Sequence, residues 1–350
     1  MARLGIIVNP RARRASQPGI VSELEAICRR TPGLSFRIFL TRSPAELDAA
    51  MQSLADLGTD ILAPCGGDGT LTATLSAAYR VFGPSLPSFL PLAGGTINTI
   101  ARNLGANEPP QKRLTKVLNS LAHHRDGLAH RLQATVLVQS HGELPLNFQT
   151  LSPRGDIPQV SGERIGFLCS AAMGARFLAA YTATPHRGLL SASVLAIRTI
   201  ASSLIPGGGP LARWLFSPLP TELWVDGLRQ SEPTYQLLIA STVPDVGLGM
   251  RVPWRAGSVT DRFHLIASSL STVKNALQVP RMLRGEPLRG SPHLDTLAST
   301  STLKFEQPEP IVLDGELFCA QRLDLSIGPT LRVISPEVAP QGLEPRTLRV

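Results

Sequence analysis

The chain has 350 residues, of which 43% are hydrophobic and 17% charged, a composition that excludes an intrinsically disordered protein. Its length predicts two domains, each large enough to bury its own core. The net charge of +8 favours anionic partners such as nucleotide phosphates or acidic lipid headgroups, whereas 5% aromatic residues, with no basic run interleaved with rings, disfavour nucleic acid.

Strand and helix patterns alternate over the first 130 residues. Residues 4–10 (LGIIVNP) are a short aliphatic run that stops at Asn9-Pro10, as is typical of a buried parallel strand. The alternation predicts an open parallel sheet with helices on both faces, in which ligands bind at the carboxyl ends of the strands. Further strands with their loops are predicted over 35–41, 60–70 and 88–98, and helices over 20–28, 43–58, 71–83, 99–105 and 114–124.

The second half has a different pattern. From about Leu132, short β-like runs follow one another, interrupted by a helical insert over roughly 172–204, which predicts an antiparallel β-sandwich. The longest apolar stretch, 188–209, contains Arg198 and several serines and is too polar to span a bilayer. We therefore expect an α/β domain over 1–131, a β-sandwich domain over 132–335, and a tail, 336–350, that packs back on the first domain.

The stretch APCGGDGTLTAT, 63–74, places Asp68 among three glycines between a predicted strand and a predicted helix. Such a turn exposes successive backbone N–H groups, and the helix dipole adds partial positive charge. Glycine lets phosphate oxygens approach where a Cβ would collide. Thr70 can place a hydroxyl near the same oxygens, and Asp68 can orient Mg²⁺ or a reacting hydroxyl.

A second glycine loop, GGTIN at 94–98, repeats the layout, and Thr96 and Asn98 again offer side-chain hydrogen bonds at a helix start. One such loop alone is compatible with an ordinary tight turn, but two on neighbouring crossovers predict a phosphate site. Neither loop matches the dinucleotide fingerprint or the Walker A motif.

Four motifs in this order, IIVNP, GGDGT, GGTINTIARNLG and VLDGEL, resemble the diacylglycerol kinase catalytic-domain superfamily, which includes bacterial diacylglycerol-type, sphingosine and ceramide kinases. GGDGT alone is shared with NAD kinases and the phosphofructokinase-like fold. The resemblance implies phosphorylation of a lipid hydroxyl by ATP, with Mg²⁺, in a cleft between a nucleotide-binding catalytic domain and a lipid-substrate domain. It implies that ATP is held by Asn9, Thr41, Gly66, Gly67, Asp68, Gly69, Thr70, Leu71, Thr72, Gly95 and Thr96, with Asn98 supporting the second loop.

The late motif PIVLDGELF places Asp314 and Glu316 two residues apart, so the two would share a face if the strand continues through them. The alternative is a hairpin turn at Asp-Gly with a solvated glutamate. Phosphoryl transfer needs positioning, charge neutralisation and a carboxylate to accept the hydroxyl proton. The family pattern implies that Glu316 is this base and that Asp314 lies near the metal and its water, with Asp68 as the competing base.

The sequence also departs from the family. Asn98 is followed by Thr99 where related lipid kinases usually carry an acid, and Arg176 lies where an acid is common in the second domain. The first departure removes one acidic contact, and the second disfavours a sphingosine-like amine acceptor. Asp261 resembles a ligand of the structural Mg²⁺ seen in some bacterial members, but Arg262 replaces the glycine that follows it there.

We therefore expect a cytoplasmic ATP-dependent lipid kinase that phosphorylates a diacylglycerol- or ceramide-like lipid and docks transiently on the anionic inner membrane face. Two alternatives stay open at this point. One is an NAD kinase-like enzyme with a small-molecule acceptor. The other is a degenerate member that binds lipid or nucleotide without catalysis. The four cysteines are widely separated and are expected to be reduced: Cys28, Cys65, Cys169 and Cys319.

Overall fold

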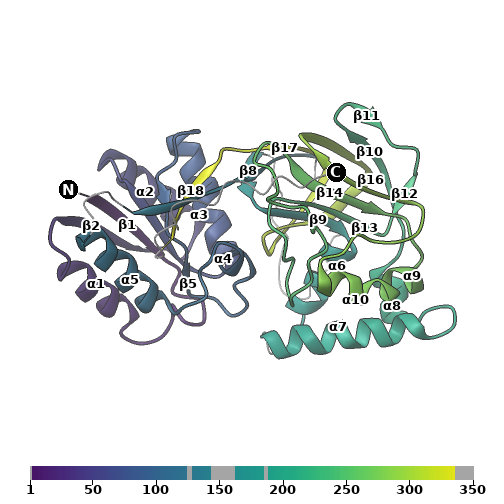
Figure 1. The fold of residues 1–350 in the computed structure, drawn as a ribbon, viewed down its shortest axis with the longest axis horizontal. Coiled ribbons are helices and arrows are strands. Elements are labelled where there is room, and N and C mark those ends of the chain that lie inside the picture. The colour runs from purple at the N-terminus through teal and green to yellow at the C-terminus, as the bar shows by residue number, and fades with distance from the viewer. Residues whose placement is uncertain (1, 124–127, 143–161, 185–187, 336–350) are drawn as a thin grey trace, which may run out of the picture.

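The computed structural model describes residues 2–123, 128–142, 162–184 and 188–335, which form two domains lying side by side (Figure 1). The N-terminal domain has a mostly parallel sheet with helices, and the C-terminal domain has an antiparallel sheet with helices at one edge. The predicted fold class is therefore confirmed.

Seven strands form the N-terminal sheet: β1 (Ala2–Val8), β2 (Leu34–Leu40), β3 (Ile61–Gly66), β4 (Ser88–Phe89), β5 (Leu92–Ala93), β6 (Ala129–Gln133) and β18 (Leu331–Ser335). Their order is β2-β1-β3-β4-β18-β6, with β5 also paired to β3. All pairs are parallel except β18 with β6. The carboxyl ends of β1, β2 and β3 therefore meet at one edge, where parallel sheets bind ligands.

The helices of this domain are α1 (Ile20–Arg29), α2 (Pro44–Asp56), α3 (Asp68–Phe82), α4 (Thr99–Asn103) and α5 (Pro110–His123). Helices α1 and α5 pack together, as do α2 and α3, and two separate apolar cores show that both faces of the sheet are covered (Figure 1). Ser43 caps α2, because its side chain accepts the Glu46 N–H at 3.2 Å.

Helix α3 begins at Asp68, three residues before the predicted start at 71. Gly67 is its N-cap in an extended conformation, and Asp68 fits the first turn because an acid there interacts favourably with the helix dipole. Most of the GGDGT motif is thus helical, and Gly67 is the single residue between the end of β3 at Gly66 and the start of α3.

Eleven strands form the C-terminal sheet: β7 (Val136–His141), β8 (Gly162–Gly166), β9 (Leu168–Ala172), β10 (Leu219–Val225), β11 (Leu228–Arg229), β12 (Thr234–Tyr235), β13 (Leu237–Ser241), β14 (Phe263–Ser268), β15 (His293–Ala298), β16 (Thr300–Leu313) and β17 (Glu316–Ile327). Their pairing is antiparallel throughout. Side chains from β9, β13 and β14 share one core with those of β10, β16 and β17, so the sheet encloses its apolar interior.

The predicted helical insert contains α6 (Met173–Thr182) and α7 (Leu189–Leu204), which α8 (Pro210–Leu215) follows. With α9 (Thr272–Leu277) and α10 (Val279–Arg284), they gather at the lower edge of the C-terminal domain in Figure 1. Among the described residues, no helix is both long and apolar enough to cross a membrane. All four cysteines are free and buried.

Within the described residues the chain passes between the domains twice, after β6 and after β17, and these two connections touch. Thr135, between β6 and β7, donates its hydroxyl to Pro329 O at 2.8 Å and accepts the Gly328 N–H at 3.0 Å. The chain thus returns to the N-terminal sheet at Leu331, within the range predicted for the second domain. The predicted packing of the tail, 336–350, falls outside the described residues.

Candidate active site between the two domains

The two glycine loops touch each other through bare backbone. Gly94 N–H donates to Gly66 O at 2.8 Å, and a Cβ added to Gly94 would lie 3.0 Å from Gly66 N. A Cβ on Gly95 would overlap Gly67 Cα, and one on Gly66 would overlap the Thr70 side chain. Glycine is therefore needed for the close approach of the loops themselves, in addition to any approach of a ligand.

Asn9 and Thr41 lie beside these loops at the ends of neighbouring strands. Asn9 Nδ2 donates to Thr70 Oγ1 at 2.9 Å, and its Oδ1 accepts the Arg11 N–H at 3.0 Å. Thr41 is buried and donates its N–H to Val8 O at 2.9 Å. The resemblance assigned both residues to ATP, and both lie at the ligand-binding edge of the parallel sheet.

Asn98 shapes the second loop. Its side chain accepts the Gly95 N–H at 2.9 Å and donates to Gly95 O at 3.1 Å, and its backbone is left-handed, with a φ of 55°. Asparagine tolerates this conformation better than most residues because its short side chain can hydrogen-bond locally. Thr96 lies inside the loop that Asn98 closes and is partly exposed.

The start of α3 presents donors that the helix does not use. The first helical hydrogen bond runs from Leu71 N–H to Gly67 O at 3.1 Å, so the N–H groups of Asp68, Gly69 and Thr70 precede the ladder. Together with the helix dipole, such groups favour an anion. Leu71 and Thr72 are also predicted ATP contacts, but their side chains are buried. A nucleotide could therefore contact only the backbone of these two residues.

The Asp68 carboxylate caps α4. Its Oδ2 accepts the Thr99 N–H at 2.7 Å, and its Oδ1 accepts the Ile100 N–H at 2.9 Å. Burial raises the pKa of Asp68 to about 6, and these hydrogen bonds oppose the rise. Because both oxygens are engaged, Asp68 is a poorer candidate for the general base than its position in the motif suggests.

Asp314 and Gly315 form a hairpin turn between β16 and β17, with left-handed φ values of 50° and 95°, and Leu313 pairs with Glu316. The strand therefore does not continue through Asp314, and the two carboxylates do not share a strand face. The hairpin alternative is correct for the backbone, since Asp-Gly favours this type of tight turn. The solvated glutamate that this alternative predicts is wrong, because Glu316 is partly buried.

The Asp314 side chain connects the domains. Its Oδ2 accepts the Thr72 hydroxyl of α3 at 2.8 Å and the Phe167 N–H at 2.9 Å, and its Oδ1 accepts the Leu168 N–H at 2.8 Å. Burial raises the pKa of Asp314 to about 7 in spite of these bonds. A side chain with this many protein donors is a structural link between α3 and the second domain.

Glu316 lies over the start of α3. A Cβ on Gly69 would come within 3.1 Å of Glu316 Cγ and 3.2 Å of its Oε1. Burial raises the pKa of Glu316 to about 6, opposed by the positive charge of Arg164, whose guanidinium stacks 4.5 Å from the Phe318 ring centroid. Within the described residues no hydrogen bond or ion pair engages the Glu316 carboxylate, so it is available to accept a proton.

An apolar cavity of about 260 Å³ opens onto two of these carboxylates. Asp68, Asp314 and Gly315 line it, together with Thr99 of α4. The remaining walls are mostly aliphatic and aromatic side chains from α6, α7, α9 and α10, among them Phe177, Leu178, Ala196, Ile200, Ala276 and Met282. The arrangement can place an apolar molecule with a polar end beside the loops.

Two further predicted residues lie apart from this centre. Asp261 is exposed in the segment before β14, and Arg176 donates to Ser217 O at 2.5 Å, tying α6 to the segment after α8. Among the described residues, no three His, Cys, Asp or Glu side chains form a group that could hold a metal ion. The metal roles of Asp261 and Asp314 stay predictions.

Sequence reasoning missed Arg164 and the walls of the cavity. The walls come from several segments that share no spacing, so no motif reports them. One signal was present in α7, which carries apolar residues on both faces and only one charge, Arg198.

Known proteins resemble the chain in one domain by sequence and over its whole length by fold. Residues 3–129 match the family model of the diacylglycerol kinase catalytic domain. A diacylglycerol kinase structure from Bacillus anthracis str. Sterne aligns at 12% identity and a TM-score of 0.57, covering 96% of this chain and 97% of that one.

A second structure from the same organism, of a candidate diacylglycerol kinase, aligns with equal coverage and identity and a TM-score of 0.63. No curated protein sequence matches the chain. At this identity the structural likeness establishes the fold alone, while the family model confirms the resemblance drawn from the motifs. Residues 3–129 therefore match the diacylglycerol kinase catalytic-domain family, and the chain shares the two-domain fold of these bacterial structures.

Proposed function

We propose that the protein is an ATP-dependent lipid kinase that transfers the γ-phosphate to a hydroxyl of a diacylglycerol- or ceramide-like lipid. The family of the N-terminal domain supports a kinase. One observation supports a lipid as the acceptor. The apolar cavity is lined by Asp68 of the first glycine loop and by Asp314 and Gly315, whose hairpin lies against that loop.

The loops fit a nucleotide triphosphate. Gly67 would place a Cβ 3.6 Å from Gly95 Cα and is otherwise open, so the turn leaves room for phosphate oxygens beside the unused N–H groups of α3. Asn9, Thr41 and Thr96 surround the same edge and would contact the nucleotide. Mg²⁺ is usually held by one or two carboxylates together with substrate phosphates, and it would neutralise phosphate charge at this position.

In this proposal Glu316 accepts the proton of the lipid hydroxyl as that oxygen attacks the γ-phosphorus, and the bond from this phosphorus to the β,γ-bridging oxygen breaks to release ADP. The raised pKa of Glu316, about 6, makes it a stronger base than an exposed glutamate while leaving it ionised at neutral pH. Asp314 holds the hairpin that carries Glu316, and Asp68 holds α4 at the cavity wall. Both act by positioning.

The test is phosphate transfer from labelled ATP to dioctanoylglycerol, with NAD as the competing acceptor. We expect labelled lipid and unlabelled NAD. Glu316→Gln should lower kcat on the order of 10²- to 10⁴-fold, as expected for loss of general-base catalysis, with the urea midpoint unchanged.

The matched control is Glu306→Gln, at an exposed position of β16, which should keep the wild-type rate. Label in NAD would favour the NAD kinase-like alternative. Label in neither acceptor, nor in a short-chain ceramide offered in the same assay, would favour a non-catalytic member, and an unchanged rate in Glu316→Gln would remove this residue from the mechanism.

A further inference from the structure

Helix α7 has two apolar faces. Ala192, Ala196 and Ile200 point to the cavity and form part of its wall. On the opposite side, Leu190 is 79% exposed and Ile197 is 64% exposed. The outward apolar residues follow the spacing i, i+4, i+7 and i+14 of a single helical stripe, namely Leu190, Val194, Ile197 and Leu204.

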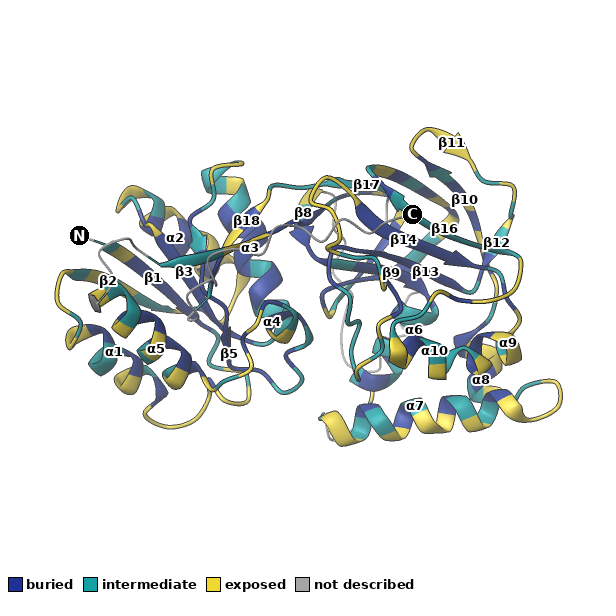
Figure 2. Ribbon diagram, viewed as in Figure 1, coloured by how far each residue is buried: buried dark blue, intermediate teal, exposed yellow. Residues whose placement is uncertain are grey.

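The short helices beside α7 also carry exposed apolar residues. Helix α7 packs against α8 and α9, and α9 packs against α10. Figure 2 shows exposed positions recurring along α7 at the free edge of the domain. We call these residues the helical face: Leu190, Val194, Ile197, Leu204, Trp214, Val273, Leu277 and Leu283, all exposed. Large exposed apolar groups gathered at one edge are typical of an interaction surface.

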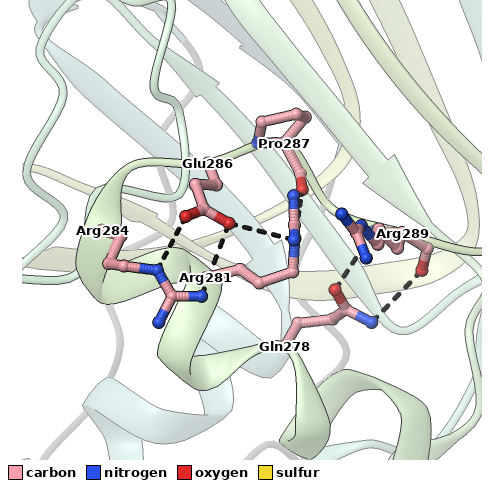
Figure 3. Close-up of polar contacts among 6 residues, drawn as sticks. All are labelled: Gln278, Arg281, Arg284, Glu286, Pro287 and Arg289. Carbon is pink, nitrogen blue, oxygen red and sulfur yellow. Dashed lines mark hydrogen bonds and ion pairs between the residues drawn. The ribbon is translucent and has the colours of Figure 1, made fainter.

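The same segments are strongly basic. Residues 189–217 and 269–292 carry six lysines and arginines and one acid, Glu286, which accounts for five of the eight net positive charges of the chain. Figure 3 shows that Glu286 is held by Arg281, at 2.9 Å, and by Arg284, at 2.7 Å. The one negative charge is thus neutralised inside the cluster, and Gln278 fixes the loop beyond it through two hydrogen bonds with the Arg289 backbone.

The other four cations of these two segments are exposed, and within the described residues their side chains make no hydrogen bond or ion pair: Arg198, Arg213, Lys274 and Arg289. Arg198 lies on α7 itself, Arg213 on α8 and Lys274 on α9, the two helices that pack against α7, and Arg289 follows α10. A second copy of this chain would bring its own five net positive charges against these, so self-association through this face is opposed by repulsion.

We propose that the helical face is the surface on which the protein docks to an anionic bilayer, with the apolar side chains in the acyl boundary and the four cations at the headgroups. Amphipathic helices bind membranes in this way. We assign this docking surface from the exposure and charge of its residues. The inference rests on the proposed function in one respect, which is that the lipid reaching the cavity is the substrate of the kinase. Because α7 is both the docking surface and the cavity wall, a lipid would enter beside it.

The test is sedimentation of the full chain with vesicles, which needs no catalysis. We expect binding to vesicles of phosphatidylcholine and phosphatidylglycerol, little binding to phosphatidylcholine alone, and weaker binding as salt rises. Equal binding to both vesicle types, or binding to neither, would overturn the proposal.

Two variants separate the apolar and the charged contributions. The apolar variant replaces Leu190, Ile197 and Leu277 with Ser, and the charge variant replaces Arg198, Arg213, Lys274 and Arg289 with Gln. Each should lower the partition coefficient on the order of 100-fold, since single exposed leucines and surface cations each contribute severalfold. Both variants should keep the circular dichroism spectrum and the urea midpoint of the wild type.

Matched controls use exposed residues away from the helical face. Leu57, Leu132 and Leu228 are replaced with Ser in one variant, and Arg30, Arg37, Arg42 and Lys112 with Gln in another. These should sediment as the wild type does. An equal loss in the controls would show a general effect of charge or hydrophobicity and would overturn the assignment of this face.

Failure of docking and failure of the kinase proposal give different results. With water-dispersed dioctanoylglycerol, the docking variants should phosphorylate at the wild-type rate. If no lipid is phosphorylated while vesicle binding still depends on the helical face, the kinase proposal fails and the docking proposal stands. If the variants change the mass measured by light scattering and the wild type binds no vesicles, the face joins two copies and the docking proposal fails.

Discussion

The glycine loops of the N-terminal domain and the apolar cavity of the C-terminal domain meet at the same carboxylates, but they are built in different ways. The loops consist of a few residues that contact each other through their backbone atoms, so almost every position is constrained. Gly66, Gly67, Gly94 and Gly95 approach within contact distance. The cavity walls come from four helices and several strands, and any aliphatic side chain of suitable size can fill a given place.

This difference explains why the first region carries recognisable motifs and the second does not. A phosphate site needs particular backbone geometry, which only glycine and a few capping residues allow. An acyl-type cavity needs volume and low polarity, which many sequences provide. Substitutions in the loops should therefore act sharply and locally, whereas substitutions in the cavity should act gradually and according to size.

Between the loops and the cavity, the larger effect is expected in the loops, where two glycines can be compared. Gly95→Ala should push the loops apart, because its Cβ would overlap Gly67 Cα, and kcat/KM should fall on the order of 100-fold with a lower urea midpoint. In Gly67→Ala the new Cβ would contact only Gly95 Cα, at 3.6 Å, so this variant should fold normally.

Gly67→Ala should nevertheless bind ATP weakly in calorimetry, since its Cβ would project into the space assigned to phosphate. Wild-type ATP affinity in this variant would mean that the glycines serve the contact between the loops alone, and the phosphate site would have to lie elsewhere.

At the junction of the two regions, Asp314→Ala should lower the free energy of unfolding by about 3 kcal/mol. The substitution leaves the N–H groups of Phe167 and Leu168 buried without their acceptor, and it breaks the bond to Thr72. Urea denaturation measures this loss. A change below about 0.5 kcal/mol, the range of ordinary surface substitutions, would show that Asp314 does not join the domains.

The pH dependence of the transfer step should follow Glu316. Its pKa is raised to about 6 by burial, and the base must be ionised, so the single-turnover rate should fall about tenfold per pH unit below that value and level off above it. Rapid-quench measurements from acid to neutral pH would give this profile. A rate that stays level down to the ordinary glutamate pKa would contradict the assignment of the base.

The smallest effect is expected in the cavity. Ala196→Phe would fill space at the wall formed by α7, and KM for long-chain diacylglycerol should rise roughly tenfold, with little change for dioctanoylglycerol. Comparing KM across chain lengths separates this effect from a general loss of activity. Equal changes for short and long chains would place the acyl group outside this cavity.

Much of the N-terminal domain could be predicted from the sequence, because its strands are continuous aliphatic runs and its helices carry caps such as Ser43 with Glu46. The glycine loops could be predicted for a similar reason, since strand, glycine and helix follow each other directly along the chain. The antiparallel character of the second domain was also evident from its short alternating runs.

The roles of individual carboxylates could not be predicted. Asp68 bonds to Thr99 and Ile100, about thirty residues away, and Asp314 bonds to Phe167 and Leu168, at the junction of β8 and β9. Such partners are set by tertiary packing, which leaves no local pattern. The motifs therefore identify three acids without distinguishing their roles. The structure shows that, among the described residues, only the Glu316 carboxylate of the three accepts no hydrogen bond from the protein.

Strand β18 has a consequence for how the protein must be made. It lies between β4 and β6 in the N-terminal sheet, although more than 190 residues separate it from β6 along the chain. A nascent polypeptide cannot complete its first domain until residues 331–335 have left the ribosome, so the two halves must mature together. A fragment that stops at residue 131 would expose β4 and β6 as unpaired edges and would be prone to aggregate.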